Sequence, residues 1–167
     1  MKRLIASDVC LSFLAPSLAF ALDSKGAAHF GGTVKTFGEA KDPVEGRLDT
    51  KNEEALIFTA DDKPFKGEKL STLYKDVIDL EFGQKAGRRV GAAVATTVLL
   101  GPIGLLALFS KKRAHYLTIG YTDANQQAQV AVLELGKDLV RTTLPIVATR
   151  SGKAMQYQDE EARKSAK

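Results

Sequence analysis

The chain contains very little of the residue types that carry metal or redox chemistry. It has one cysteine, two histidines and no tryptophan in 167 residues. A single cysteine excludes an intramolecular disulfide bond, and His29 and His115 do not lie at a spacing typical of a zinc site. The glycine motifs of phosphate and dinucleotide sites are missing, as is the Gly-x-Ser-x-Gly motif of many hydrolases. We therefore predict a protein that is not an enzyme and that has no metal and no cofactor.

Aromatic residues are few, and the charges are unevenly placed. Eight phenylalanines and four tyrosines are scattered along the chain, which argues against nucleic acid as a partner. The net charge is only +4, but basic residues flank a run of twenty uncharged residues at 90–109, the uncharged segment. Basic residues beside an apolar run favour anionic lipid as the partner, although they are equally consistent with solvated ends of an apolar element. The predicted contacts with lipid phosphates are Arg88, Arg89, Lys111, Lys112 and Arg113.

The N-terminus has the pattern of an export signal. It begins with Met-Lys-Arg, continues as a largely apolar stretch and reaches a small-x-small cleavage pattern, Ala-Phe-Ala, at 19–21. We predict a signal peptide over residues 1–21 and an exported, membrane-associated protein of the bacterial cell envelope. An uncleaved anchor and a misassigned start codon are the alternatives. Residues 22–45 are rich in Gly, Ala and charge and are predicted to be a linker, with one short strand at 33–37.

From residue 46 onward the apolar residues follow the two-residue period of β-strands. Ile78, Leu80 and Phe82, for example, alternate with Asp79 and Glu81 and are predicted to share one face of a strand. The period then changes to that of a helix, whose apolar stripe needs a sheet to pack against. That stripe consists of Leu139, Val140, Thr143, Leu144 and Val147. The predicted strands lie within 54–60, 70–83, 114–122 and 128–136, the helix spans 137–152, and a charged tail over 154–167 is expected to fray.

The order of these elements resembles that of the bacterial pleckstrin-homology-like and GRAM-like domains. The matching stretches are LSTLYKDVIDLEFG at 70–83, KKRAHYLTIGYTD at 111–123 and AVLELGKDLVRTTLPIVATRSGK at 131–153. The resemblance covers residues 46–153 and implies a bent antiparallel sheet or small open barrel, capped by the C-terminal helix. It also implies a domain that binds lipid or protein and catalyses no reaction. The expected fold class is α+β, with an apolar hairpin inserted at 90–109.

The uncharged segment is long enough to cross a bilayer as one helix of about 30 Å. Gly101 and Pro102 near its middle favour a turn instead, and a single crossing would separate strands that are expected to share one sheet. We therefore predict a hairpin inserted into the membrane. The alternatives are a single spanning helix, and a hairpin that folds over its own domain or forms a contact between copies of the chain. The side chains predicted to insert are Val94, Val98, Leu99, Leu100, Ile103, Leu105, Leu106, Leu108 and Phe109.

Two functional hypotheses follow from these patterns. The first is a non-enzymatic binding domain of the cell envelope that is attached to membrane lipid by the uncharged segment. The alternative is a soluble exported interaction protein that oligomerises through residues 90–109, or binds another protein through them.

Overall fold

The computed structural model describes residues 23–33, 35–37, 40, 42–84 and 114–166. These residues form an α+β structure, which consists of one eight-stranded sheet and of helices that pack against it. In chain order the elements are β1 (Asp23–Gly32), the 3-10 helix η1 (Lys35–Phe37), β2 (Val44–Asp49), β3 (Ala55–Ala60), β4 (Lys69–Leu73), the 3-10 helix η2 (Tyr74–Asp76), β5 (Val77–Gly83), β6 (His115–Thr122), β7 (Ala128–Leu135), α2 (Lys137–Ser151), β8 (Met155–Tyr157) and α3 (Glu160–Ser165).

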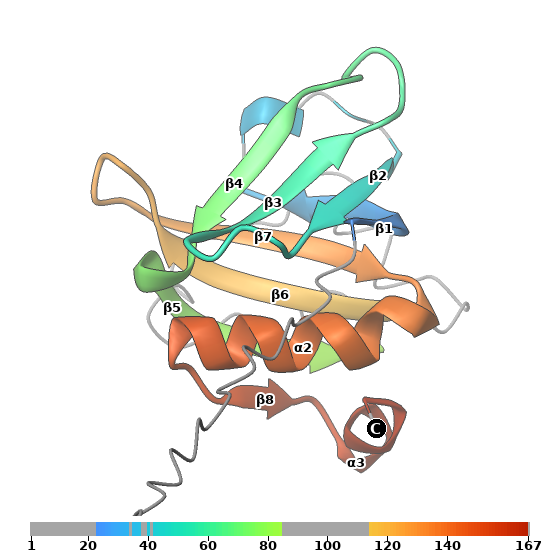
Figure 1. Ribbon diagram of the computed structural model, residues 1–167, viewed down its shortest axis with the longest axis vertical. Coiled ribbons are helices and arrows are strands. Elements are labelled where there is room, and N and C mark those ends of the chain that lie inside the picture. Colours follow the sequence, from blue (N-terminus) through green and yellow to red (C-terminus); the bar gives the residue numbers. More distant parts are fainter. Residues whose placement is uncertain (1–22, 34, 38–39, 41, 85–113, 167) are drawn as a thin grey trace, which may run out of the picture.

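The strands form one open sheet in the order β4-β3-β2-β1-β7-β6-β5-β8. Two antiparallel meanders, β1 to β4 and β5 to β7, are joined by the pairing of β1 with β7. Figure 1 shows β2, β3 and β4 running steeply across the direction of β6 and β7, with α2 lying across the sheet. The short strand β8 pairs with β5 in parallel, so the sheet is mixed and not purely antiparallel as the sequence predicts.

The pairing of β5 with β6 confirms that the strands before and after the uncharged segment belong to one sheet. Phe82 lies opposite Leu117, and both side chains are fully withdrawn from water. This is the expected result of alternation, because side chains of one parity point to the same face. One position differs from the prediction. The register shifts between Val77 and Asp79, and Ile78 therefore packs with residues of the other face of the sheet.

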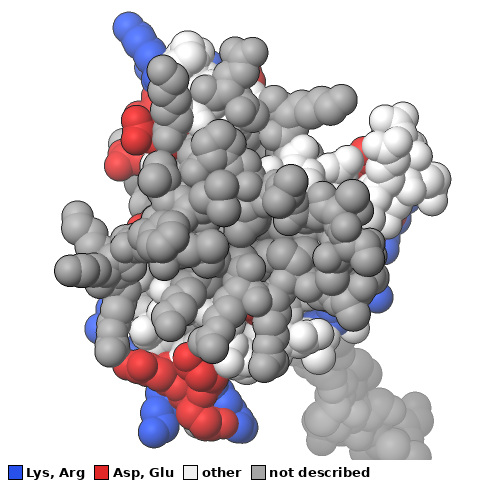
Figure 2. Space-filling view, turned by 180° about the vertical axis from the view of Figure 1, so that it is seen from behind, with Lys and Arg blue, Asp and Glu red and all other residues white. Residues whose placement is uncertain are grey.

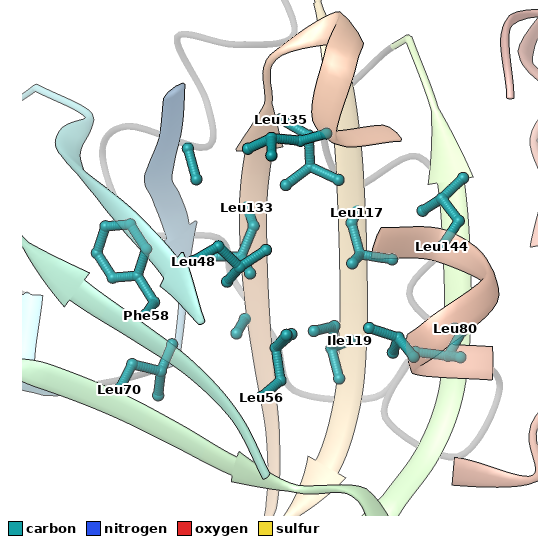
Figure 3. Close-up of a cluster of buried hydrophobic side chains, with 14 of the residues drawn as sticks. Leu48, Leu56, Phe58, Leu70, Leu80, Leu117, Ile119, Leu133, Leu135 and Leu144 are labelled. Carbon is teal, nitrogen blue, oxygen red and sulfur yellow. The ribbon is translucent and has the colours of Figure 1, made fainter. Parts of the chain in front are cut away.

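Helix α2 packs against the sheet through the apolar stripe that its sequence predicts. The buried residues of the helix are Leu139, Val140, Thr143, Leu144 and Val147. Figure 3 shows Leu144 in one cluster with Leu80 of β5 and Leu117 of β6. The helix ends before Gly152, whose φ of 66° is a left-handed conformation that glycine adopts without a steric penalty. Helix and sheet thus bury each other's apolar faces, which is what stabilises both.

Two segments that the sequence predicts to be a linker and a fraying tail carry regular structure. The first contains β1, which lies in the middle of the sheet between β2 and β7 although its glycine-rich sequence does not alternate. The second contains β8 and α3. Asp159 Oδ1 accepts a hydrogen bond from the backbone N–H of Ala162 at 2.8 Å, and the Ala162 side chain is fully buried. Pairing with strands distant in sequence therefore overrides the weak local signal.

Within the described part of the chain, no helix is both long and apolar enough to cross a membrane. This finding corrects the transmembrane interpretation of the sequence. The uncharged segment, the five basic residues that flank it and the predicted signal peptide all lie outside the described residues. The inserted hairpin therefore stays a prediction.

Candidate functional site

The C-terminal end of α2 lies near η2 and the loop between β2 and β3 (Figure 1). Residues of these three segments line a pocket. Its volume is about 530 Å³. We call it the η2 pocket, and it is lined by Glu53, Glu54, Leu73, Tyr74, Lys75 and Arg150. The sequence predicted none of these as site residues, and the residues that it did predict, between 88 and 113, lie outside the described part of the chain.

Arg150 holds the pocket together from the last turn of α2. Its Nη1 atom donates to the backbone oxygen of Thr50 at 2.6 Å and to that of Asn52 at 2.9 Å. The same nitrogen lies 3.5 Å from the Tyr74 hydroxyl oxygen, and the guanidinium carbon is 5.6 Å from the centre of the Tyr74 ring. A hydrogen bond from a charged donor is stronger than a neutral one, so one side chain ties the helix to both η2 and the loop.

The loop between β2 and β3 is shaped by its own polar side chains. Asn52 Oδ1 accepts hydrogen bonds from the backbone N–H groups of Glu54 and Ala55, each at 2.8 Å. Asp49 Oδ1 accepts another from the backbone N–H of Lys51 at 2.7 Å. Such local bonds fix a turn before any ligand arrives, which reduces the entropy lost on binding. The backbone conformation of this part of the pocket rim is therefore fixed by hydrogen bonds within the loop itself.

Leu73 provides the apolar part of the pocket. Its side chain is 37% exposed, which makes it one of the two large apolar side chains that are exposed on the described surface. It lies on the solvent side of β4 together with Lys69 and Ser71, whereas Leu70 and Thr72 of the same strand are buried. An isolated exposed leucine is ordinary on a protein surface, but this one lies inside a pocket. A leucine at a polar position of a strand was the one sequence signal for this site.

The backbone of β4 adds hydrogen-bonding groups beside the pocket. β4 pairs only with β3 and forms one edge of the described sheet. The N–H of Tyr74 donates to the oxygen of Glu54, and the oxygen of Glu68 accepts from the N–H of Ala60. Even-numbered residues of β4 therefore bond to β3, because the bonding alternates along an antiparallel strand. The N–H and C=O groups of the odd-numbered residues point away from the sheet.

The charges around the pocket are of both signs. Glu53 and Glu54 are exposed, and neither makes an ion pair within the described residues, while Lys75 and Arg150 bring two cations. The same mixture recurs elsewhere on the described surface. Figure 2 shows acidic side chains gathered with basic ones at the lower end of the molecule, where α3 lies. The η2 pocket therefore has the electrostatics of a site for a partner with mixed charge, and not those of a purely anionic ligand site.

Burial favours the neutral form of two ionisable groups, one in the pocket and one in the core. Burial raises the pKa of Tyr74 above its ordinary value, against the opposing hydrogen bond and charge of Arg150, so the phenol stays protonated. His29 is only 3% exposed, its ring centre lies 4.8 Å from that of Phe37, and burial lowers its pKa to about 4. No group of three potential metal ligands occurs among the described residues. The arrangement can therefore hold a partner through apolar, backbone and charge contacts.

No protein-family model and no curated protein matches this chain. The comparisons therefore support neither the resemblance to pleckstrin-homology-like domains nor the interpretation of the chain as a membrane protein with an export signal.

Proposed function

We propose that this protein is a non-enzymatic binding module that takes up an extended peptide segment of another protein along β4. The observation that carries the proposal is the position of the η2 pocket at the end of an edge strand. The outward backbone groups of Lys69, Ser71 and Leu73 lead directly to the exposed Leu73 side chain. The backbone groups that are available for pairing and the side-chain pocket therefore follow one another along β4.

Strand addition explains how such a site would bind. An extended peptide adds to a free sheet edge through main-chain hydrogen bonds, and side-chain pockets beside the edge provide specificity. The outward groups of Lys69, Ser71 and Leu73 supply the donors and acceptors, and the Leu73 and Tyr74 side chains supply an apolar floor. Three edge residues form a short pairing surface, so the η2 pocket has to contribute much of the affinity.

The charges of the rim indicate the composition of the peptide. Glu53 and Glu54 are adjacent, exposed and without an ion pair in the described residues, so they favour a Lys or Arg in the partner. Lys75 on the same pocket disfavours a second basic residue. The expected segment is therefore an extended peptide with one apolar residue next to one basic residue.

The substitution Ser71→Pro tests this site, because it removes an N–H that points away from β3. Proline is tolerated at such a position of an edge strand, so the fold is expected to be retained. Peptides selected from a displayed random library against the full chain are expected to share the apolar–basic pair. Their Kd is expected to rise at least about tenfold in Ser71→Pro, since the edge pairing is lost.

Two matched variants complete this experiment. Ser71→Ala keeps the N–H and is expected to bind peptides like the unmodified chain. Glu53→Lys is expected to raise the Kd of each peptide, and to raise it more for peptides with more positive charge. Thermal unfolding checks that each variant is folded. The proposal would be refuted if the selection enriched no peptide, or if Ser71→Pro and Ser71→Ala bound the selected peptides equally well. Attachment to a membrane through the uncharged segment is a separate prediction, which this experiment leaves untouched.

A further inference from the structure

The exposed edge of β4 is symmetric about Ser71. The backbone groups of residues 69, 71 and 73 point away from β3, and the side chains of these residues are exposed. A sheet edge of this kind is a template for another strand, including the same strand of a second copy. When the second β4 runs antiparallel to the first, Ser71 lies opposite its own counterpart, and Lys69 lies opposite Leu73 of the second copy. No other antiparallel register pairs all three outward residues of both strands.

The side chains along this edge fit the same arrangement. Leu73 lines the η2 pocket together with Glu53 and Glu54. Neither these carboxylates nor Lys69 makes an ion pair within the described residues. In the antiparallel pair the aliphatic stem of Lys69 from the second copy covers Leu73, and its ammonium group reaches towards the two carboxylates. A twofold axis through Ser71 repeats this contact at the other end of the paired strands.

The other edge of the described sheet is less accessible. It is formed by β8, a strand of three residues that pairs in parallel with β5. Helix α3 follows closely and packs against both β5 and β8 (Figure 1). Pairing of β4 with β4 also closes after two copies, whereas pairing of β4 with β8 would continue from copy to copy. The β4 edge is therefore the one that favours a closed dimer.

We propose that two copies of the chain pair antiparallel through β4 about Ser71, and that this pairing closes the peptide site. The regulatory part rests on the proposed function, because the peptide would use the same backbone groups and the same pocket. Self-pairing and peptide binding therefore exclude each other, and only the monomer takes up peptide. The contact involves no residue of the uncharged segment, in contrast to the oligomer that the sequence suggests.

The size of the contact determines its strength. Three outward residues on each strand form a small interface, and stable interfaces bury about 1,200 Å² or more. The dimer is therefore expected to be weak and to form only as the concentration of the protein rises. A peptide that binds the monomer alone shifts the equilibrium away from the dimer by mass action. A weak contact of this kind suits regulation, since a peptide can displace it.

Disulfide formation at single positions of β4 tests the pairing. The native Cys10 is first replaced by serine in the full chain, and Ser71→Cys or Lys69→Cys is then introduced. Opposite residues at position 71 have Cα atoms about 5.5 Å apart, which suits a disulfide. The two copies of position 69 lie about 13 Å apart along the strands and cannot be bridged. Under mild oxidation we expect Ser71→Cys to form covalent dimers at least about tenfold faster than Lys69→Cys.

A mixture of two variants identifies the register. Lys69→Cys and Leu73→Cys, each in the chain without Cys10, should form a mixed disulfide with each other faster than either forms with itself. All three positions are exposed on the same side of β4, so chance collisions would link them equally. Equal rates at positions 69 and 71, or no covalent dimer at position 71, would overturn the proposal.

Reversal of the charges provides an independent test by sedimentation. Lys69→Glu places an acid beside Glu53 and Glu54 of the second copy, and should raise the Kd of the dimer at least about tenfold. Combination with Glu53→Lys and Glu54→Lys should restore association, which also shows that the strand is intact. Lys63→Glu, an equal change of charge in the exposed loop between β3 and β4, is the control and should associate like the unmodified chain. A monomer at every concentration, or association that Lys69→Glu leaves unchanged, contradicts the proposal.

The locked dimer tests the regulatory part. Peptides that have been selected against the unmodified chain should bind oxidised Ser71→Cys at least about tenfold more weakly than the same protein after reduction. Equal binding by the two forms would show that pairing does not close the site, and would overturn the proposal. Cross-linking is measured without peptide, so the two proposals can fail separately. Peptide binding without a cross-link at position 71 would remove the self-pairing alone, whereas a cross-link without any enriched peptide would support the pairing and remove the proposed function.

Discussion

His29 should make the stability of this protein depend on pH in a range where few other groups titrate. Its imidazole is buried between aromatic rings, with Phe37 at 4.8 Å and Phe58 at 6.3 Å between ring centres. Its Nε2 atom is buried and has no hydrogen-bond partner in the described structure. The charged form would lose its hydration there, and burial therefore lowers the pKa from 6.5 to about 4.

The sign and size of the effect follow from this difference in pKa. Above pH 6.5 the histidine is neutral in both the folded and the unfolded chain, and folding is not penalised. As the pH falls from 6.5 towards 4, the unfolded chain binds a proton that the folded chain does not, so stability decreases. At about 1.4 kcal/mol for each pKa unit, the total loss at the acid end is about 3 kcal/mol. This is a large part of the stability of an ordinary domain.

Urea denaturation at a series of pH values between 4 and 7.5 measures the effect. In His29→Leu the loss of stability below pH 6.5 should be smaller than in the unmodified protein by about 2 kcal/mol at pH 5, because only the histidine contribution is removed. Carboxylate groups contribute equally to both proteins and cancel in the difference. His115→Leu is the control, since His115 is less buried and should leave most of the pH dependence in place. Parallel curves for His29→Leu and the unmodified protein would refute the reasoning.

Three further predictions concern stability and are measured by urea or thermal denaturation. Arg150→Ala should lower the free energy of unfolding by about 2 kcal/mol, since two backbone oxygens lose a charged donor, whereas Arg141→Ala on the exposed side of the same helix should change it by less than about 0.5 kcal/mol. Gly46→Ala should cost about 3 kcal/mol, because a Cβ there would lie 2.3 Å from a backbone oxygen of β3, and the exposed neighbour Glu45 should tolerate alanine. Removal of residues 154–167 should lower the thermal midpoint by about 5 °C, and an unchanged midpoint would mean that β8 and α3 are dispensable.

Much of the fold could be predicted because it depends on short-range spacing. The strands β3, β5, β6 and β7 and the helix α2 each lie within a stretch whose apolar residues repeat with the appropriate period. The common sheet of β5 and β6 also followed, since neither strand could bury its apolar face alone. β1 was not predicted, because its sequence has no such apolar period. Its glycines carry no pattern, and its extended form is imposed by β2 on one side and β7 on the other.

The functional surfaces were much less predictable than the strands. Arg150 binds the oxygen of Thr50 from 100 positions away and approaches Tyr74 from 76 positions away, so no local pattern could bring these residues together.

The sequence was sufficient for the α+β class, the position of most strands and the buried stripe of α2, because each rests on contacts between residues two to four positions apart. The tertiary structure alone decided that β1 and β8 complete the sheet, that β4 is left at its edge and that the η2 pocket opens beside it. These features depend on which strands pair and on where distant loops meet. Such pairings are set by the burial of all apolar faces together, and no single segment contains that information.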